Sequence, residues 1–175
     1  YDSLDVLKKD IAATKDKLIN VAYEDIQDIA EILCPVQGND PSWSRGAQGF
    51  IRALMIAMLE DSLNPELGMN KEKFNFYNVY KIYYTLQMAG IRDEGNDNFV
   101  TLRKYFQGRP KTSPTYDLAG TVVNNAGATS KGYMGHVTSS LNVFADTGVC
   151  YLTSGTDINF SEFADKPTAL FIIIP

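Results

Sequence analysis

The most regular pattern of apolar and polar positions lies in the segment 40–61, which reads DPSWSRGAQGFIRALMIAMLED. Apolar side chains recur there every three or four residues, as one face of an α-helix requires: Ala47, Phe50, Ile51, Leu54, Met55, Met58 and Leu59. Asp40 and Pro41 supply a capping residue and a proline suited to the first helical turn. The other side is apolar too, so we expect a central core helix.

Helical periodicity recurs in five further segments: 23–34, 75–90, 97–106, 114–128 and 129–146. The first of these helices should stop before Pro35, and Gly90 is the expected C-terminal cap of the second. Asp97 and Pro114 are placed to begin the next two. The pattern therefore predicts a mainly α fold, a compact domain of five or six helices.

The C-terminal segment 166–175 breaks this helical pattern. It reads KPTALFIIIP, and Ala169 to Ile174 carry no polar side chain. Such a β-branched run between prolines is typical of a strand that is buried on both faces of a parallel sheet. A lone strand lacks hydrogen-bonding partners, so we expect it to join a sheet formed by other parts of a longer polypeptide. A weaker strand signal lies at 151–153.

Composition and charge narrow the function classes. The chain of 175 residues has a net charge of -5 and is 45% apolar, which allows one core and argues against a wholly cationic nucleic-acid-binding surface. Two cysteines fit a reducing compartment, and no apolar stretch reaches the ~20 residues of a membrane helix. A local basic cluster stands out in 101–135: Arg103, Lys104, Arg109, Lys111 and Lys131. It is a candidate for binding DNA or a protein partner, with a solvated loop as the alternative.

Recognised catalytic patterns are missing from the sequence. It has no GxxxxGK[ST] phosphate loop and no CxxC pair, and His136 is its one histidine. The adjacent acids Glu60 and Asp61 are better explained as solvated helix-end carboxylates, because neighbours in sequence do not face each other on a helix. Tyrosines at 77, 80, 83 and 84 follow core spacing, although aromatic side chains can also stack on bases.

Two segments together suggest a known family. The stretch 40–61 resembles the "DPFW, then Ala-rich amphipathic helix" signature of type IV secretion coupling proteins, the TraG/TraD-type conjugative DNA-transfer ATPases. The stretch 139–175 is similar to the family's Phe, Val and Thr positions followed by a Pro-Thr strand that ends in Ile-Pro. The opening YDSLDVL is similar to the family's Tyr-Asn-Pro-Phe/Leu-Asp start, and departs from it at Asp2, Ser3 and Leu4.

This resemblance implies an architecture. In that family an all-helical domain interrupts a RecA-like ATPase core, so residues 1–165 would be the all-α substrate-recognition domain and 166–175 the strand that re-enters the core. The full-length parent would be a membrane-anchored homo-hexamer at the cytoplasmic face of the cell membrane, and would use ATP and Mg. The segment itself would be soluble, bind no cofactor or metal, carry no catalytic residue and make no membrane contact.

The resemblance also implies a function: recognition of relaxosome or secreted substrate proteins, with single-stranded DNA as a further candidate ligand, so that DNA-protein substrates reach the secretion channel. Two alternatives stay open. One is a structural insert that makes contacts between ring subunits. The other is a stand-alone small helical enzyme that uses His136 with a nearby carboxylate.

Overall fold

The computed structural model describes residues 2–36, 38, 40–68, 73–93, 98–124 and 127–155, together with 163, 169 and 171. Within these residues the chain forms seven α-helices and no strand. The helices are α1 (Asp2–Leu33), α2 (Ser42–Ser62), α3 (Phe76–Asp93), α4 (Asn98–Gln107), α5 (Thr115–Val123), α6 (Gly127–Leu141) and α7 (Thr147–Thr153). Two short 3-10 helices, η1 (Pro65–Leu67) and η3 (Asn142–Ala145), follow α2 and α6.

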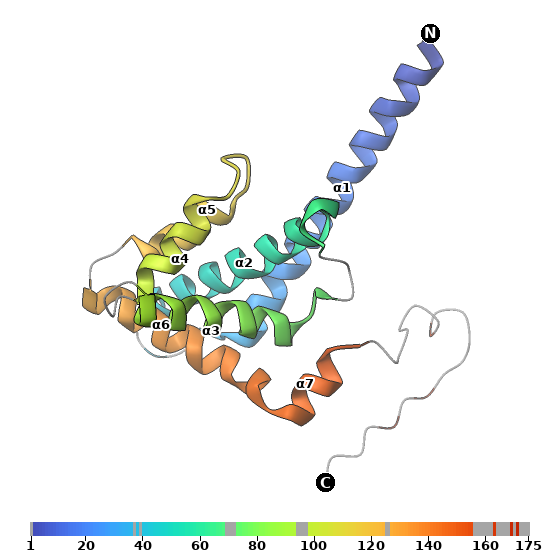
Figure 1. Ribbon diagram of the computed structural model, residues 1–175. Helices are drawn as coiled ribbons and strands as arrows, with labels where there is room; N and C mark the ends of the chain where they lie inside the picture. Colours follow the sequence, from blue (N-terminus) through green and yellow to red (C-terminus); the bar gives the residue numbers. More distant parts are fainter. Residues whose placement is uncertain are drawn as a thin grey trace.

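Helix α2 lies at the centre of the bundle, as its sequence predicts. It contacts α1, α3, α5 and α6, which surround it in Figure 1. Eleven of its 21 residues are buried, and they occupy both the predicted apolar face and its opposite side. Asp40 precedes the N-cap residue Pro41 and accepts a hydrogen bond from the Ser42 backbone N–H at 2.9 Å. The central-helix prediction is confirmed.

Helix α1 is much longer than predicted. The apolar pattern indicated a helix over 23–34, whereas α1 spans Asp2–Leu33. Its N-terminal half projects beyond the bundle in Figure 1, and its C-terminal half packs on α2. The helical spacing of apolar residues therefore indicated only the part of α1 that packs against the core.

Three other sequence predictions need correction. Gly90 does not cap a helix, because α3 continues through it to Asp93. The single helix expected over 114–128 ends at Val123, and α6 begins at Gly127, whose φ of +42° suits glycine. The weak strand at 151–153 is wrong, since these residues form the last turn of α7. Asp146 caps α7 through hydrogen bonds of 2.8 and 3.0 Å from the backbone N–H groups of Gly148 and Val149.

Most of the predicted strand at 169–174 lies outside the described residues. Its two described members, Ala169 and Phe171, belong to no regular element and are exposed. The mainly helical class is confirmed, and the re-entrant strand stays a prediction.

Close packing of α2 on α6 depends on two glycines. Trp43 of α2 and Tyr133 of α6 lie with ring centroids 4.9 Å apart. Each ring covers a glycine of the opposite helix: a Cβ on Gly132 would lie 2.4 Å from the Trp43 ring, and a Cβ on Gly46 would lie 2.3 Å from the Tyr133 ring. Both distances are far below van der Waals contact, so only glycine permits this approach.

The tyrosines of α3 take structural positions. Tyr83 is 1% exposed, and its hydroxyl lies 2.6 Å from Thr138 Oγ1 and accepts a hydrogen bond of 2.7 Å from Gln87 Nε2. Burial raises the pKa of Tyr83 to about 12. Tyr80 and Tyr84 stack on each other with centroids 5.9 Å apart, and Tyr84 is partly exposed. The core interpretation holds for Tyr83.

Candidate functional site

The fold divides the predicted basic cluster, and the Arg109 side chain is one of its two members with internal contacts. Its guanidinium donates to Glu60 Oε2 at 2.7 Å, to the Ala57 carbonyl at 3.0 Å and to Asp61 Oδ1. The Arg109 side chain is only 10% exposed. It therefore joins the α4–α5 connection to the last turns of α2, where it satisfies both carboxylates and a helix carbonyl.

The sequence-based interpretation of Glu60 and Asp61 is corrected by this arrangement. They were expected to be solvated and to point apart, but both converge on the one guanidinium of Arg109. Tyr23 of α1 donates to Glu60 at 3.2 Å, and Ser113 donates to the same carboxylate at 3.0 Å. A connected polar network thus ties α1, α2 and the α4–α5 connection together.

Tyr105 closes this network on the α4 side. Its hydroxyl lies 3.4 Å from Asp61 Oδ2, and its ring lies under the Arg109 guanidinium at 5.7 Å. Burial, with the neighbouring Asp61 charge, raises the pKa of Tyr105 to about 12. Desolvation, followed by the Glu60 charge, also raises the pKa of Tyr23. Both phenols are thereby kept neutral as hydrogen-bond donors.

Arg103 also has an internal partner. Its Nε and Nη2 both donate to the Val123 carbonyl, at 3.1 and 3.0 Å. Val123 is the last residue of α5, where carbonyls lack helical partners and the helix dipole favours a cation. Arg103 therefore fixes the end of α5 against α4.

The three lysines of the predicted cluster are exposed. Lys104 lies on α4, Lys111 on the α4–α5 connection and Lys131 on α6. The five predicted residues are accordingly two arginines with internal contacts and three exposed lysines on different elements. Their role in binding DNA or a partner stays a prediction.

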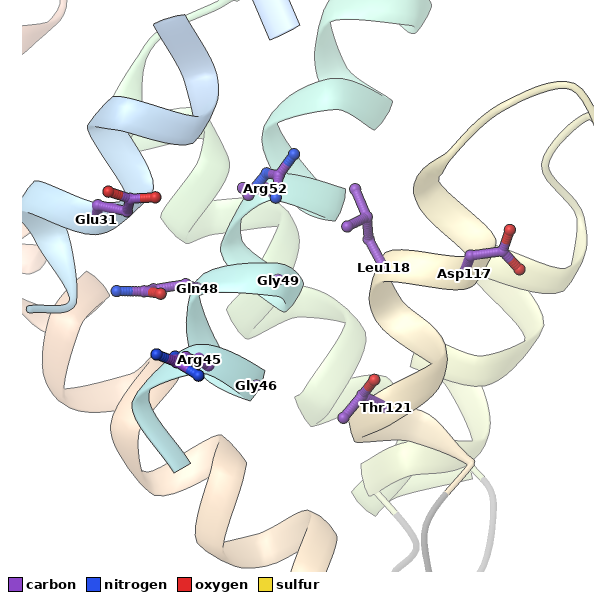
Figure 2. A pocket seen from close by; sticks show the side chains of 9 residues that line it. All are labelled: Glu31, Arg45, Gly46, Gln48, Gly49, Arg52, Asp117, Leu118 and Thr121. Atoms are coloured by element: carbon purple, nitrogen blue, oxygen red, sulfur yellow. The ribbon is translucent and has the colours of Figure 1, made fainter. Parts of the chain in front are cut away.

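A pocket that sequence reasoning missed lies beside α2, where Arg45 and Arg52 occupy the same side of the helix. The pocket has a volume of about 400 Å³. Figure 2 shows Gly46 and Gly49 between the two arginines, with Asp117, Leu118 and Thr121 of α5 across from them. Glu31 of α1 borders the pocket on the other side. Three helices thus build this site.

The two arginines of this pocket differ from Arg109 in their partners. Among the residues that the structure describes, neither Arg45 nor Arg52 forms an ion pair. The Arg52 Nε–H group is buried and donates no hydrogen bond to the described residues. Gln48 is not available as a free ligand, because its amide donates to the Cys34 carbonyl at 2.8 Å. The open cationic groups of the pocket are therefore its two guanidinium groups.

The signal that could have revealed these arginines is their spacing. Positions 45 and 52 are seven residues apart, which places them on one side of α2. Both are long cations within a helix whose other positions are mostly apolar or small. The regular spacing of apolar residues in α2 predicts the face that packs in the core, and gives no information on the side that carries the two arginines.

His136, the residue of the enzymatic alternative, is an exposed residue of α6. It borders a hollow of about 350 Å³ with Ser139, Ser140 and the buried Cys34. The hollow's described lining includes no carboxylate that could pair with the imidazole. No group of three potential metal ligands occurs in the described part of the chain.

The class of protein follows from this helical body and from a comparison with protein families. The model of the type IV secretory system conjugative DNA transfer family matches residues 11–175. The chain belongs to that family, which confirms the resemblance seen in its sequence. No curated protein and no solved structure matches it. In the described helices, none has both the length and the apolar content needed to cross a membrane.

Proposed function

We propose that this chain is the substrate-recognition module of a conjugative coupling protein. In this role it binds relaxosome proteins or secreted substrate proteins, so that DNA-protein substrates reach the type IV secretion channel. The observation that carries the proposal is the Arg45–Arg52 pocket, an accessible site with two unpaired cations on the helical body of a DNA-transfer family member. Unpaired charges at a concave site favour specific recognition of a charged partner.

The chemistry of transfer is assigned to the parent protein. ATP and Mg are expected to bind a RecA-like core in a homo-hexameric parent at the cytoplasmic face of the membrane. The helical module binds no cofactor in this scheme and performs no catalysis itself. It selects the cargo on which the parent acts.

The direct test of recognition uses the 175-residue chain and purified relaxosome proteins of the same mobile element. Biolayer interferometry should detect salt-sensitive binding to at least one of them, and the unrelated protein lysozyme should serve as a cationic control. Binding that is equally strong to lysozyme would reduce the interaction to non-specific charge attraction by an acidic chain.

Single-stranded DNA is tested separately, with the exposed lysines alone. A Lys104→Gln, Lys111→Gln, Lys131→Gln variant should bind oligo-dT more weakly and with a shallower salt dependence, because three phosphate-binding cations are removed. Arg103 and Arg109 are left intact since they have partners inside the fold. Unchanged oligo-dT affinity would eliminate the lysines as the DNA-binding groups.

Contacts between ring subunits are a second candidate function, and α7 supplies the observation that favours it. Tyr151 and Leu152 are 80% and 75% exposed, and no residue of α7 is buried. Adjacent large apolar side chains on a surface helix are typical of protein contacts. In analytical ultracentrifugation of the full-length parent, a Tyr151→Ser, Leu152→Ser variant should lose higher oligomers if α7 makes ring contacts.

A further inference from the structure

The Arg45–Arg52 pocket has a definite spacing between its two charges. The α-helical rise of 1.5 Å per residue puts positions seven apart about 10 Å from each other along α2. Figure 2 shows the stretch of α2 between them, which carries Gly46 and Gly49. A ligand that contacts both guanidinium groups must therefore span about 10 Å.

Neither guanidinium has its charge neutralised by a residue that the structure describes. The Arg52 Nε lies buried without an acceptor, so the groups that a ligand would contact are the terminal nitrogens of the guanidinium. The Nε of Arg109 is likewise without an acceptor, but there the terminal nitrogens already hold two carboxylates and a carbonyl. Arg45 and Arg52 have no such internal partners, so their hydrogen-bonding capacity remains open to a ligand.

The charges around the pocket favour a ligand with separate carboxylates, as on a protein segment, and disfavour a continuous chain of phosphates. Glu31 and Asp117 stand on opposite sides of it and would repel a polyanion that runs across the site. The net charge of -5 acts in the same direction. A protein segment can place two carboxylates on the arginines and keep neutral or basic side chains near the two acids.

We propose that this pocket binds an acidic helical segment of a protein partner, with two carboxylates seven residues apart, one on Arg45 and one on Arg52. The distance between the two arginines suggests that the partner segment is a helix. Positions i and i+7 of a helix lie on one face and about 10 Å apart, as the two arginines do. The planar guanidinium fork suits a carboxylate in two-point contact. The inference rests on the proposed recognition function and names its chemistry.

Synthetic helical peptides test the proposal against the 175-residue chain. The probe peptide carries two glutamates seven residues apart in an Ala/Gln background, and the comparison peptide has the same composition with the glutamates five apart, on different faces. Fluorescence anisotropy at ~50 mM salt should show tighter binding of the first peptide. An Arg45→Gln, Arg52→Gln variant should lose affinity by about tenfold for each charge-assisted contact removed, about 100-fold in all.

Two variants serve as controls. The Lys104→Gln, Lys111→Gln variant also removes two positive charges, at another place on the surface. It should change peptide affinity by less than about threefold. Arg45→Lys, Arg52→Lys keeps the charge but lacks the planar fork, so its affinity should be intermediate. Far-UV circular dichroism checks that each variant is folded.

Several outcomes would overturn the acidic-helix proposal. Equal affinity for both peptides, or equal losses in the arginine and lysine variants, would mean that only diffuse charge is sensed. Oligo-dT binding that disappears with Arg45→Gln, Arg52→Gln, without peptide binding, would make the pocket a nucleic-acid site. If relaxosome proteins still bind this variant at full strength, the pocket proposal fails and recognition stands. If the peptide binds but no relaxosome protein does, the proposal of an acidic-helix site stands and the proposed recognition function is refuted.

Discussion

Arg109 provides the sharpest test of the fold, because its removal should destabilise the chain far more than an ordinary surface substitution. An Arg109→Met change keeps an unbranched apolar stem, removes the guanidinium, and leaves Glu60 and Asp61 without a countercharge. Both carboxylates are largely buried, with 24% and 18% of their side chains exposed. Loss of one partner from a buried ion pair costs about 3–5 kcal/mol, and this residual exposure favours the lower end, about 3 kcal/mol.

The measurement is urea unfolding, followed by far-UV circular dichroism and by the fluorescence of the single tryptophan, Trp43. With a urea dependence of about 2.5 kcal/mol per molar for a domain of this size, the midpoint should fall by about 1 M. A Lys111→Met variant is the matched control. It removes an exposed cation two residues away and should change stability by less than about 0.5 kcal/mol.

A third variant separates the ion pair from the packing around it. Replacing Glu60, Asp61 and Arg109 together by Gln, Asn and Met removes all three charges, so no uncompensated carboxylate remains. It should recover at least half of the stability that Arg109→Met loses, because a complete buried ion network often contributes little net stability. A midpoint for Arg109→Met within about 0.2 M of the parent chain would refute the structural role of Arg109.

Three further predictions concern packing, titration and capping. Gly46→Ala should destabilise the chain by about 1–3 kcal/mol in urea unfolding because its Cβ meets the Tyr133 ring, whereas Gly135→Ala, which meets nothing within 4 Å, should stabilise by up to about 1 kcal/mol. Tyr83 and Tyr105 have raised pKa values of about 12, so their neutral forms contribute fully to folding stability below pH ~10, and this contribution is lost between pH ~10 and ~12. Absorbance at 295 nm should show two phenols that titrate later than the others. Titration of every tyrosine near pH 10 would contradict this. Asp146→Ala should cost about 1 kcal/mol and increase amide exchange in α7 alone, and unchanged exchange there would exclude the cap.

The parts of the fold that could be predicted from sequence are those where burial imposes a period. Helix α2 is buried on two sides, so its apolar residues repeat without interruption, and Asp40 and Pro41 mark its start. The N-terminal half of α1 projects from the bundle, and no core imposes a pattern on it. Its Lys, Asp and Ala residues support a helix by intrinsic propensity, which is a weaker signal than periodicity.

Short helices were predicted less well because local composition opposed them. Helix α7 has seven residues, among them Val149, Tyr151 and Thr153, which favour strands by intrinsic preference. Its formation depends on the Asp146 cap and on contacts with α3 and η3. The contact with α3 joins segments far apart in the chain, so the local sequence of 147–153 does not reveal it.

The candidate site could not be predicted for a related reason. The sequence gives the number of charged residues, but it does not show which of them pair with one another in the fold. Arg109 and its carboxylate partners Glu60 and Asp61 are separated by 49 and 48 positions. The density of basic residues in 101–135 therefore suggested an open surface where the fold makes an internal ion network. Arg45 and Arg52 lie in no basic cluster, and neither forms an ion pair with a residue that the structure describes.

This difference decides how binding to this module has to be measured. Removing Arg103, Lys104, Arg109 and Lys111 together would weaken DNA binding for two unrelated reasons, loss of exposed charge and loss of the contacts that hold α4 and α5 to the rest of the bundle. A reduced affinity in that variant would not distinguish a phosphate contact from partial unfolding. Substitution of the exposed lysines alone changes surface charge while both internal arginine contacts persist. Any loss of DNA affinity in the lysine variant can then be attributed to the surface itself.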